Sequence, residues 1–138
     1  MPRILLDTNI VLDVLLARHP FVDDAVKIWH AADDGLFDAS IASFTIPTIY
    51  YICRKQQSAD AAARAVDICL EACEIAPLYR ECILAARRMD GPDFEDNLQI
   101  ACAITDFMQG IVTRNPRDFA GSPIRVYTPQ ELLAELHC

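Results

Sequence analysis

Short apolar segments alternate with helical patterns along the whole chain, and this alternation constrains the fold more than any other feature. The first segment, Arg3–Asp7, is apolar up to its final carboxylate, which is typical of a strand buried on both faces of a parallel sheet. Strands that alternate with helices form parallel sheets covered by those helices. We therefore expect a three-layer α/β/α domain around a mainly parallel sheet of four to five strands.

The expected elements follow from apolar runs and from apolar residues at helical spacing. The strands are Arg3–Asp7, Ala39–Ala42, Glu74–Ala76, Gly110–Thr113 and Arg125–Tyr127. The helices are 10–15, 22–32, 45–55, 61–72, 78–89, one that starts after Asp93 and one that starts at Thr128-Pro129. A chain of 138 residues is long enough to bury a core, and we expect one domain over residues 1–138.

Composition and charge restrict the function classes. The chain is 53% hydrophobic, but no run reaches the roughly 20 apolar residues that cross a membrane. The N-terminus becomes acidic at Asp7, before a signal peptide could form, so we expect a soluble cytoplasmic protein. The net charge of −8 argues against a broad basic surface for nucleic acid. It is compatible with a nuclease that gathers acids around metal ions.

The cysteines and histidines show no metal-ligand spacing. No Cys-x-x-Cys pattern occurs, and we expect most of the cysteines to be buried reduced thiols: Cys53, Cys69, Cys73, Cys82, Cys102 and Cys138. The three histidines are expected to be solvated or locally hydrogen-bonded: His19, His30 and His137. The same holds for five acids in the first helices and loops: Asp13, Asp23, Asp24, Asp33 and Asp34.

The stretch Gly91–Ala103 combines a chain breaker, a group of acids and an apolar helix. Pro92 prevents a helix from starting before Asp93, which is a good N-cap, and Asp96 follows at capping-box spacing. The residues after it are apolar on most sides, so the helix is buried and carries its carboxylates at its N-terminus. These acids are either helix caps or one wall of a metal site.

Ligands of parallel sheets bind at the carboxyl ends of the strands. This rule selects Asp7 after the first strand and the turn 113–119 after the fourth, and the helix that begins near Asp96 could close the same crevice. Carboxylates from three segments repel one another unless a cation lies between them, and hard oxygen ligands suit Mg²⁺ or Mn²⁺. The local alternatives are a helix cap at Asp7 and ordinary turn roles for Asn115 and Asp118.

Three blocks of the sequence resemble the signature blocks of PIN domains, in the same order: Ile4–Ile10, Asp93–Gln99 and Val112–Phe119. The chain is most similar to the stand-alone prokaryotic type, such as the VapC-like toxins. The resemblance implies an endoribonuclease that depends on Mg²⁺ or Mn²⁺ and hydrolyses RNA phosphodiester bonds. It further implies the toxin of a type II toxin–antitoxin pair, with a cognate antitoxin as partner. The high apolar content suits a homodimer or a groove for a partner.

The resemblance also implies residue roles. Asp7 and Asp96 match metal ligands, and either Asp118 or Asn115 matches the last site position, where we favour Asp118 as the third catalytic acid. Further polar residues match positions that orient ligands, water or phosphate: Thr8, Asn9 and Thr113. Arg114 and Arg117 in the same turn are candidates for contacts with RNA phosphates, or are solvated charges.

The chain departs from the family pattern at the second acid. Thr48 lies where PIN nucleases usually carry a Glu, and no Glu occurs from Ala39 to Leu70. A subgroup that resembles this chain lacks the same Glu and has a segment like Tyr50–Ile52. Thr48 could bond a metal-bound water, and Asp93 or Glu95 could replace the missing charge. The alternative to an enzyme is a catalytically weak or inactive PIN-like scaffold that binds a protein or RNA.

Two other enzyme classes place an Asp after the first strand. A haloacid-dehalogenase-like site needs a second Asp two residues later, where this chain has Asn9. A phosphoacceptor receiver domain needs a lysine after a late strand, and the only lysines are Lys27 and Lys55. Both classes are disfavoured.

Overall fold

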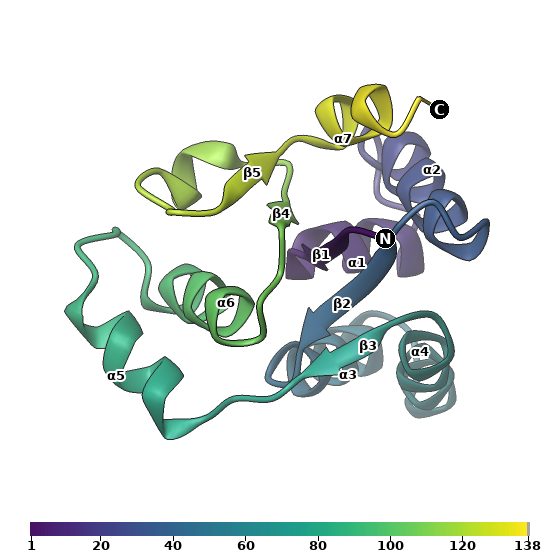
Figure 1. Ribbon diagram of the computed structural model, residues 1–138. Helices are drawn as coiled ribbons and strands as arrows, with labels where there is room; N and C mark the ends of the chain where they lie inside the picture. Colours follow the sequence, from purple (N-terminus) through teal and green to yellow (C-terminus); the bar gives the residue numbers. More distant parts are fainter. Residues whose placement is uncertain (138) are drawn as a thin grey trace.

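Five strands form one parallel sheet in the protein, which a computed structural model describes over residues 1–137 (Figure 1). The strands are β1 (Arg3–Leu6), β2 (Asp38–Ala42), β3 (Glu74–Ala76), β4 (Gly110–Val112) and β5 (Arg125–Tyr127). Their order across the sheet is β3-β2-β1-β4-β5, and every neighbouring pair is parallel. The α/β fold with a parallel sheet is confirmed.

Helices cover both faces of this sheet. They are α1 (Thr8–Leu15), α2 (Val22–Asp33), α3 (Thr45–Gln56), α4 (Ala59–Ala72), α5 (Arg80–Arg88), α6 (Phe94–Thr105), the 3₁₀ helix η1 (Pro116–Phe119) and α7 (Pro129–Glu135). Alternate residues of a strand face opposite sides. Ile4 and Leu6 of β1 therefore pack with α1 to α4 and α7, whereas Leu5 packs with α6 and η1. The central strand is buried in both directions, as its continuous apolar sequence requires.

The strands begin and end within one residue of their expected limits, and the helices differ more. β1 ends at Leu6, so Asp7 becomes the residue that precedes α1. Helix α4 begins earlier than expected, at Ala59, because the Ser58 hydroxyl accepts a hydrogen bond from the Ala61 amide. The expected turn at 116–119 is the short helix η1, in which Pro116 supplies the required φ angle.

The cysteine and histidine predictions are confirmed for the described part of the chain. The five cysteines within it are buried free thiols: Cys53, Cys69, Cys73, Cys82 and Cys102. Burial raises the pKa of Cys73 to about 12, so that thiol stays protonated at neutral pH. Cys138 lies outside the described residues, and the side chains of the three histidines are exposed. No helix within residues 1–137 is long and apolar enough to cross a membrane.

The prediction for Asp13 is wrong. This acid is not solvated, because its side chain lies on the inner face of α1 and the residue is 0% exposed. Its carboxylate forms ion pairs with Arg18, at 2.8 Å, and with Arg114, at 3.1 Å. The other acids of that group, Asp23, Asp33 and Asp34, are exposed as expected, and Asp24 is partly exposed.

Candidate active site

A polar cavity of about 280 Å³ lies at the carboxyl ends of β1 and β4, where α1, α3, α6 and the turn after β4 meet. The residues that line it are Asp7, Thr8, Asn9, Leu12, Thr48, Ile52, Asp93, Glu95, Asp96, Gln99, Asn115 and Asp118. The structure therefore brings together acids from three separate segments of the sequence.

Asp7 is the most constrained acid of the cavity. It is 5% exposed, and its side chain makes no capping hydrogen bond to α1, which excludes the simple helix-cap interpretation. Instead, its Oδ1 accepts a hydrogen bond from Gln99 Nε2 at 2.8 Å, and its Oδ2 accepts one from Thr113 Oγ1 at 2.7 Å. Burial raises the pKa of Asp7, and these two hydrogen bonds oppose that effect. The carboxylate is held on both sides in one orientation.

Asp93 and Asp96 have different roles at the start of α6. Asp93 is the helix cap, because its Oδ1 accepts a hydrogen bond from the Asp96 amide at 3.1 Å. Among the described residues the Asp96 side chain makes no reciprocal bond, so α6 has no capping box and this carboxylate is free to face the cavity. Burial and then repulsion from Asp7 and other acids of the cavity raise the pKa of Asp96 to about 7.

The start of α6 is fixed against α5 by a buried amide. Asn97 is 4% exposed, and its Nδ2 donates to the carbonyl oxygen of Ala86 at 3.5 Å. Gly91 lies so close that a Cβ there would be 2.2 Å from Asn97 Oδ1. A larger residue at position 91 would displace the Asn97 side chain from this contact with α5, next to Asp96.

Helix α3 contributes hydroxyl groups but no acid. The hydroxyl of Thr45 lies 3.0 Å from that of Thr8, which ties α3 to the start of α1. Thr48, one turn later, is partly buried and lines the cavity, and its Oγ1 donates to the carbonyl oxygen of Phe44 at 3.4 Å. Position 48 thus lines the same cavity as the acids but brings no charge.

The side chains of the turn after β4 lie in two different cavities. Asn115 and Asp118 line the cavity, and the Asn115 amide donates to Thr113 Oγ1 at 3.1 Å. Arg114 does not line it, because its guanidinium lies in a separate cavity against Asp13 and the ring of Phe21. Arg117, in η1, is exposed and is the better placed of the two arginines for a phosphate.

Gln99 is a site residue that the sequence interpretation missed. It is 1% exposed, lines the cavity and donates the hydrogen bond that orients Asp7. Its Oε1 is buried without a hydrogen-bond partner among the described residues. A signal was present, since Gln99 is a polar residue on a buried helix, one turn after Asp96 and on the same face.

Replacing Gln99 with Met is expected to weaken cation binding roughly 10- to 100-fold, as for other residues that orient a metal ligand. Without the amide donor, the pKa of Asp7 rises further and its carboxylate is free to rotate. The measurement is Mn²⁺ affinity as a function of pH. Gln130→Met is a matched control, because Gln130 also donates to a carboxylate, that of Asp24, outside this cavity. Equal affinity in the two variants would contradict the role of Gln99.

The donor set fits a hard divalent cation held in an open site. Within residues 1–137 no three acidic, histidine or cysteine side chains are grouped closely enough to form a complete metal cage. Mg²⁺ does not need such a cage, since it binds one or two carboxylates and keeps several waters. Burial is the largest cause of the raised pKa of Asp96, and repulsion from Asp7 and the neighbouring acids adds to it. A cation between the acids would relieve this repulsion.

Comparison with protein families agrees with this arrangement. A family model described as PIN domain matches residues 3–117, which include every residue that lines the cavity except Asp118. The chain belongs to the PIN domain family. Comparison with curated protein sequences found no match.

Solved structures share the PIN fold at low sequence identity. A chain of FitAcB from Neisseria gonorrhoeae is 15% identical with a TM-score of 0.71, over 92% of this chain and 98% of that one. VapC20 from Mycobacterium tuberculosis, described as a Sarcin-Ricin loop cleaving toxin, is 15% identical with a TM-score of 0.69, over 86% and 95%. A chain of a toxin-antitoxin complex from Klebsiella pneumoniae is 22% identical with a TM-score of 0.68, over 91% and 96%. At these identities the shared property is the fold.

Proposed function

We propose that this PIN domain is a metal-dependent endoribonuclease that hydrolyses RNA phosphodiester bonds and acts as the toxin of a type II toxin–antitoxin pair. The observation that carries the proposal is the convergence of Asp7, Asp96 and Asp118 in one polar cavity at the carboxyl edge of a parallel sheet. The raised pKa of Asp96 supports a cation at that point.

Asp7 and Asp96 are the proposed ligands of Mg²⁺ or Mn²⁺. When bound, such an ion neutralises charge on the scissile phosphate and makes its water more acidic. Gln99 and Thr113 each donate to one oxygen of Asp7, which keeps its carboxylate in one orientation at the cavity. Asp118 lies at the exposed rim, where its carboxylate can accept a proton from the attacking water.

RNA is the proposed substrate, since the similar structure of VapC20 is that of a toxin that cleaves the Sarcin-Ricin loop. The cavity itself is acidic, so RNA phosphates need positive charge nearby. Arg117 beside Asp118, and Arg54 and Lys55 at the end of α3, are exposed and supply it. An RNA substrate also implies action in the cytoplasm.

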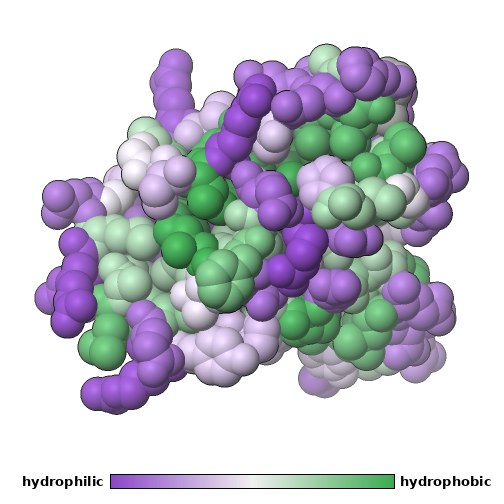
Figure 2. All heavy atoms as spheres, viewed as in Figure 1, coloured by the Kyte–Doolittle hydropathy of each residue, from purple (hydrophilic) through white to green (hydrophobic). Residues whose placement is uncertain are grey.

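A cognate antitoxin and a second copy of the chain are the proposed partners. Several similar structures are described as VapBC or toxin-antitoxin complexes, which supports the antitoxin. Apolar side chains lie exposed between charged ones on the face shown in Figure 2, and the exposed large apolar residues include Tyr51, Leu70, Tyr79, Ile83 and Leu84. These side chains are the apolar surface available for contacts with such partners.

The test of the proposal is cleavage of a structured RNA by purified protein, with and without a chelator. We expect cleavage with Mg²⁺ or Mn²⁺, its loss with EDTA, and its recovery when excess cation is added. Cleavage that persists in EDTA would contradict metal dependence. Binding of RNA or protein partners without any cleavage would favour the scaffold alternative, which the neutral Thr48 makes the second candidate.

Thr48→Glu tests the missing acid. A carboxylate at this position would face the cavity from α3, and added ligand charge strengthens binding of hard cations. We expect Mn²⁺ affinity to rise roughly 10-fold. Thr48→Gln is the control for side-chain length without charge. If the two variants bind Mn²⁺ equally, position 48 does not reach the cation.

A further inference from the structure

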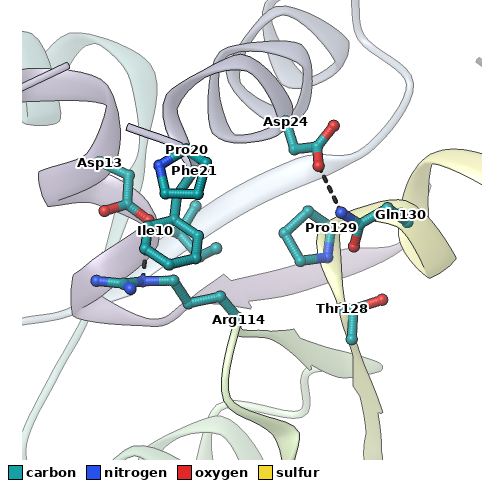
Figure 3. Close-up of a pocket in the computed structure, with 9 residues that line it drawn as sticks. All are labelled: Ile10, Asp13, Pro20, Phe21, Asp24, Arg114, Thr128, Pro129 and Gln130. Carbon is teal, nitrogen blue, oxygen red and sulfur yellow. Dashed lines mark hydrogen bonds and ion pairs between the residues drawn. The ribbon is translucent and has the colours of Figure 1, made fainter. Parts of the chain in front are cut away.

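A buried carboxylate outside the acidic cavity, that of Asp13, forms ion pairs with two arginines, Arg18 and Arg114. Figure 3 shows its pair with Arg114. Asp13, in α1, is 0% exposed and lies 2.8 Å from Arg18 Nε and 3.1 Å from Arg114 Nε. The Arg114 guanidinium also lies over the ring of Phe21, 3.9 Å from its centroid. Asp13 is therefore the point where the segment after α1 and the turn after β4 meet.

Each arginine is connected to a residue that lines the acidic cavity. Arg18 Nη2 donates to Asn9 Oδ1 at 3.0 Å, and Asn9 lines the cavity beside Asp7. Arg114 lies between Thr113, which donates to Asp7, and Asn115, which lines the cavity. One buried carboxylate thus holds two segments that approach Asp7 from different sides.

We propose that Asp13, Arg18 and Arg114 form a positioning unit that fixes Asn9 and Asn115 at the rim of the cavity. Asp13 would then be a positioning residue, since it is absent from the cavity lining and acts through the two arginines. The effect of this unit on catalysis rests on the proposed nuclease function. Its effect on the order of Asn9 and Asn115 does not depend on that function.

A contribution to the stability of the fold is by itself a weak explanation for the ion pairs of Asp13 with Arg18 and Arg114. Buried ion pairs pay a large desolvation penalty, and apolar replacements of similar volume are often neutral or stabilising. The chain contains a comparison, because Arg125 pairs with Glu135 at 3.3 Å and lies over Tyr127, 4.7 Å from its centroid, at an exposed position. That arginine has the same two kinds of contact and no connection to the cavity lining.

The experiment compares Arg114→Met and Arg18→Met with Arg125→Met. Hydrogen exchange of the metal-free protein reports the order of the Asn115 amide, which donates to Thr113 Oγ1. In Arg114→Met this amide is expected to exchange roughly tenfold faster, while the β1 amides keep their wild-type rates. Where RNA is cleaved, kcat is expected to fall roughly 10- to 100-fold in Arg114→Met and Arg18→Met with KM little changed. Arg125→Met is expected to match the wild type in both measurements.

The outcomes separate this proposal from the nuclease proposal. If the wild type cleaves no RNA, the nuclease proposal fails, and exchange at Asn115 still decides the positional role. Wild-type exchange at Asn115 in a folded Arg114→Met variant would overturn the positioning unit. The proposal would also be overturned if the β1 amides exchanged faster to the same degree as the Asn115 amide, because this indicates general destabilisation. If Arg114→Met does not fold, Arg114→Gln, which removes both the charge that pairs with Asp13 and the guanidinium on Phe21 but keeps a polar side chain, provides the same exchange readout, with the same two overturning results.

Discussion

Asp7→Asn is expected to abolish RNA cleavage, with a loss of roughly 1,000-fold or more, which corresponds to about 4 kcal/mol of transition-state stabilisation. The substitution removes a negative charge from the most constrained position of the cavity. The fold should be retained, because the Asn side chain is nearly the same shape and its Oδ1 can still accept one of the two hydrogen bonds that Asp7 accepts from Gln99 and Thr113.

The matched control for this prediction is Asp38→Asn. Asp38 is exposed at the first residue of β2, which is the opposite edge of the same sheet, so its charge is remote from the cavity. Cleavage rates and melting temperatures of both variants are the measurements. A folded Asp7→Asn variant that cleaves within a few-fold of the wild type would show that the active site lies elsewhere.

Asp96→Asn is expected to stabilise the metal-free protein at alkaline pH. The fold raises the pKa of Asp96 from 3.8 to about 7, so the folded state binds this proton more tightly than the unfolded chain. The contribution of Asp96 to stability is therefore greatest below pH 3.8 and is lost as pH rises towards 7. At pH 8 the variant should be more stable by about 1 to 2 kcal/mol, less than the pKa shift alone implies because water screens the partly exposed carboxylate.

Thermal unfolding of the metal-free proteins at pH 4 and pH 8 tests whether Asp96→Asn stabilises the fold only at the higher pH. We expect Asp96→Asn to melt about 4 °C higher than the wild type at pH 8 and at nearly the same temperature at pH 4. Asp60→Asn is the control, because Asp60 is an acid in the first turn of α4 outside the cavity. Excess Mn²⁺ should reverse the order by stabilising only the wild type. A variant that is less stable than the wild type at pH 8 without metal would refute the repulsion between the acids.

The strands could be predicted from sequence because their signal is local. Ile4, Leu5 and Leu6 are apolar in succession because helices cover both faces of β1. The limits of α4 and η1 were less predictable, since they depend on which side chain caps a helix and on how Pro116 continues the chain.

The acids of the site could be predicted because each follows a strand or begins a helix. Asp13 and Gln99 could not be placed by the same reasoning, since both act through partners that are distant in the sequence. Asp13 shares a helix face with Ile10, which marks it as buried, but nothing local identifies Arg114 as its partner. Arg114 was a candidate either for a contact with RNA phosphates or for a solvated charge, because it lies in the active-site turn. Its guanidinium instead lies against Asp13 in a separate cavity.

The central claim is that the cavity formed by Asp7 and Asp96 binds a divalent cation and cuts RNA. Calorimetry with Mn²⁺ on the wild type and on Asp96→Asn, together with cleavage of a structured RNA by both proteins, tests it most directly. We expect the wild type to bind Mn²⁺ and to cleave, and Asp96→Asn to lose both properties while it stays folded. Absence of Mn²⁺ binding by the wild type would contradict the claim and leave a PIN fold that acts without this metal site.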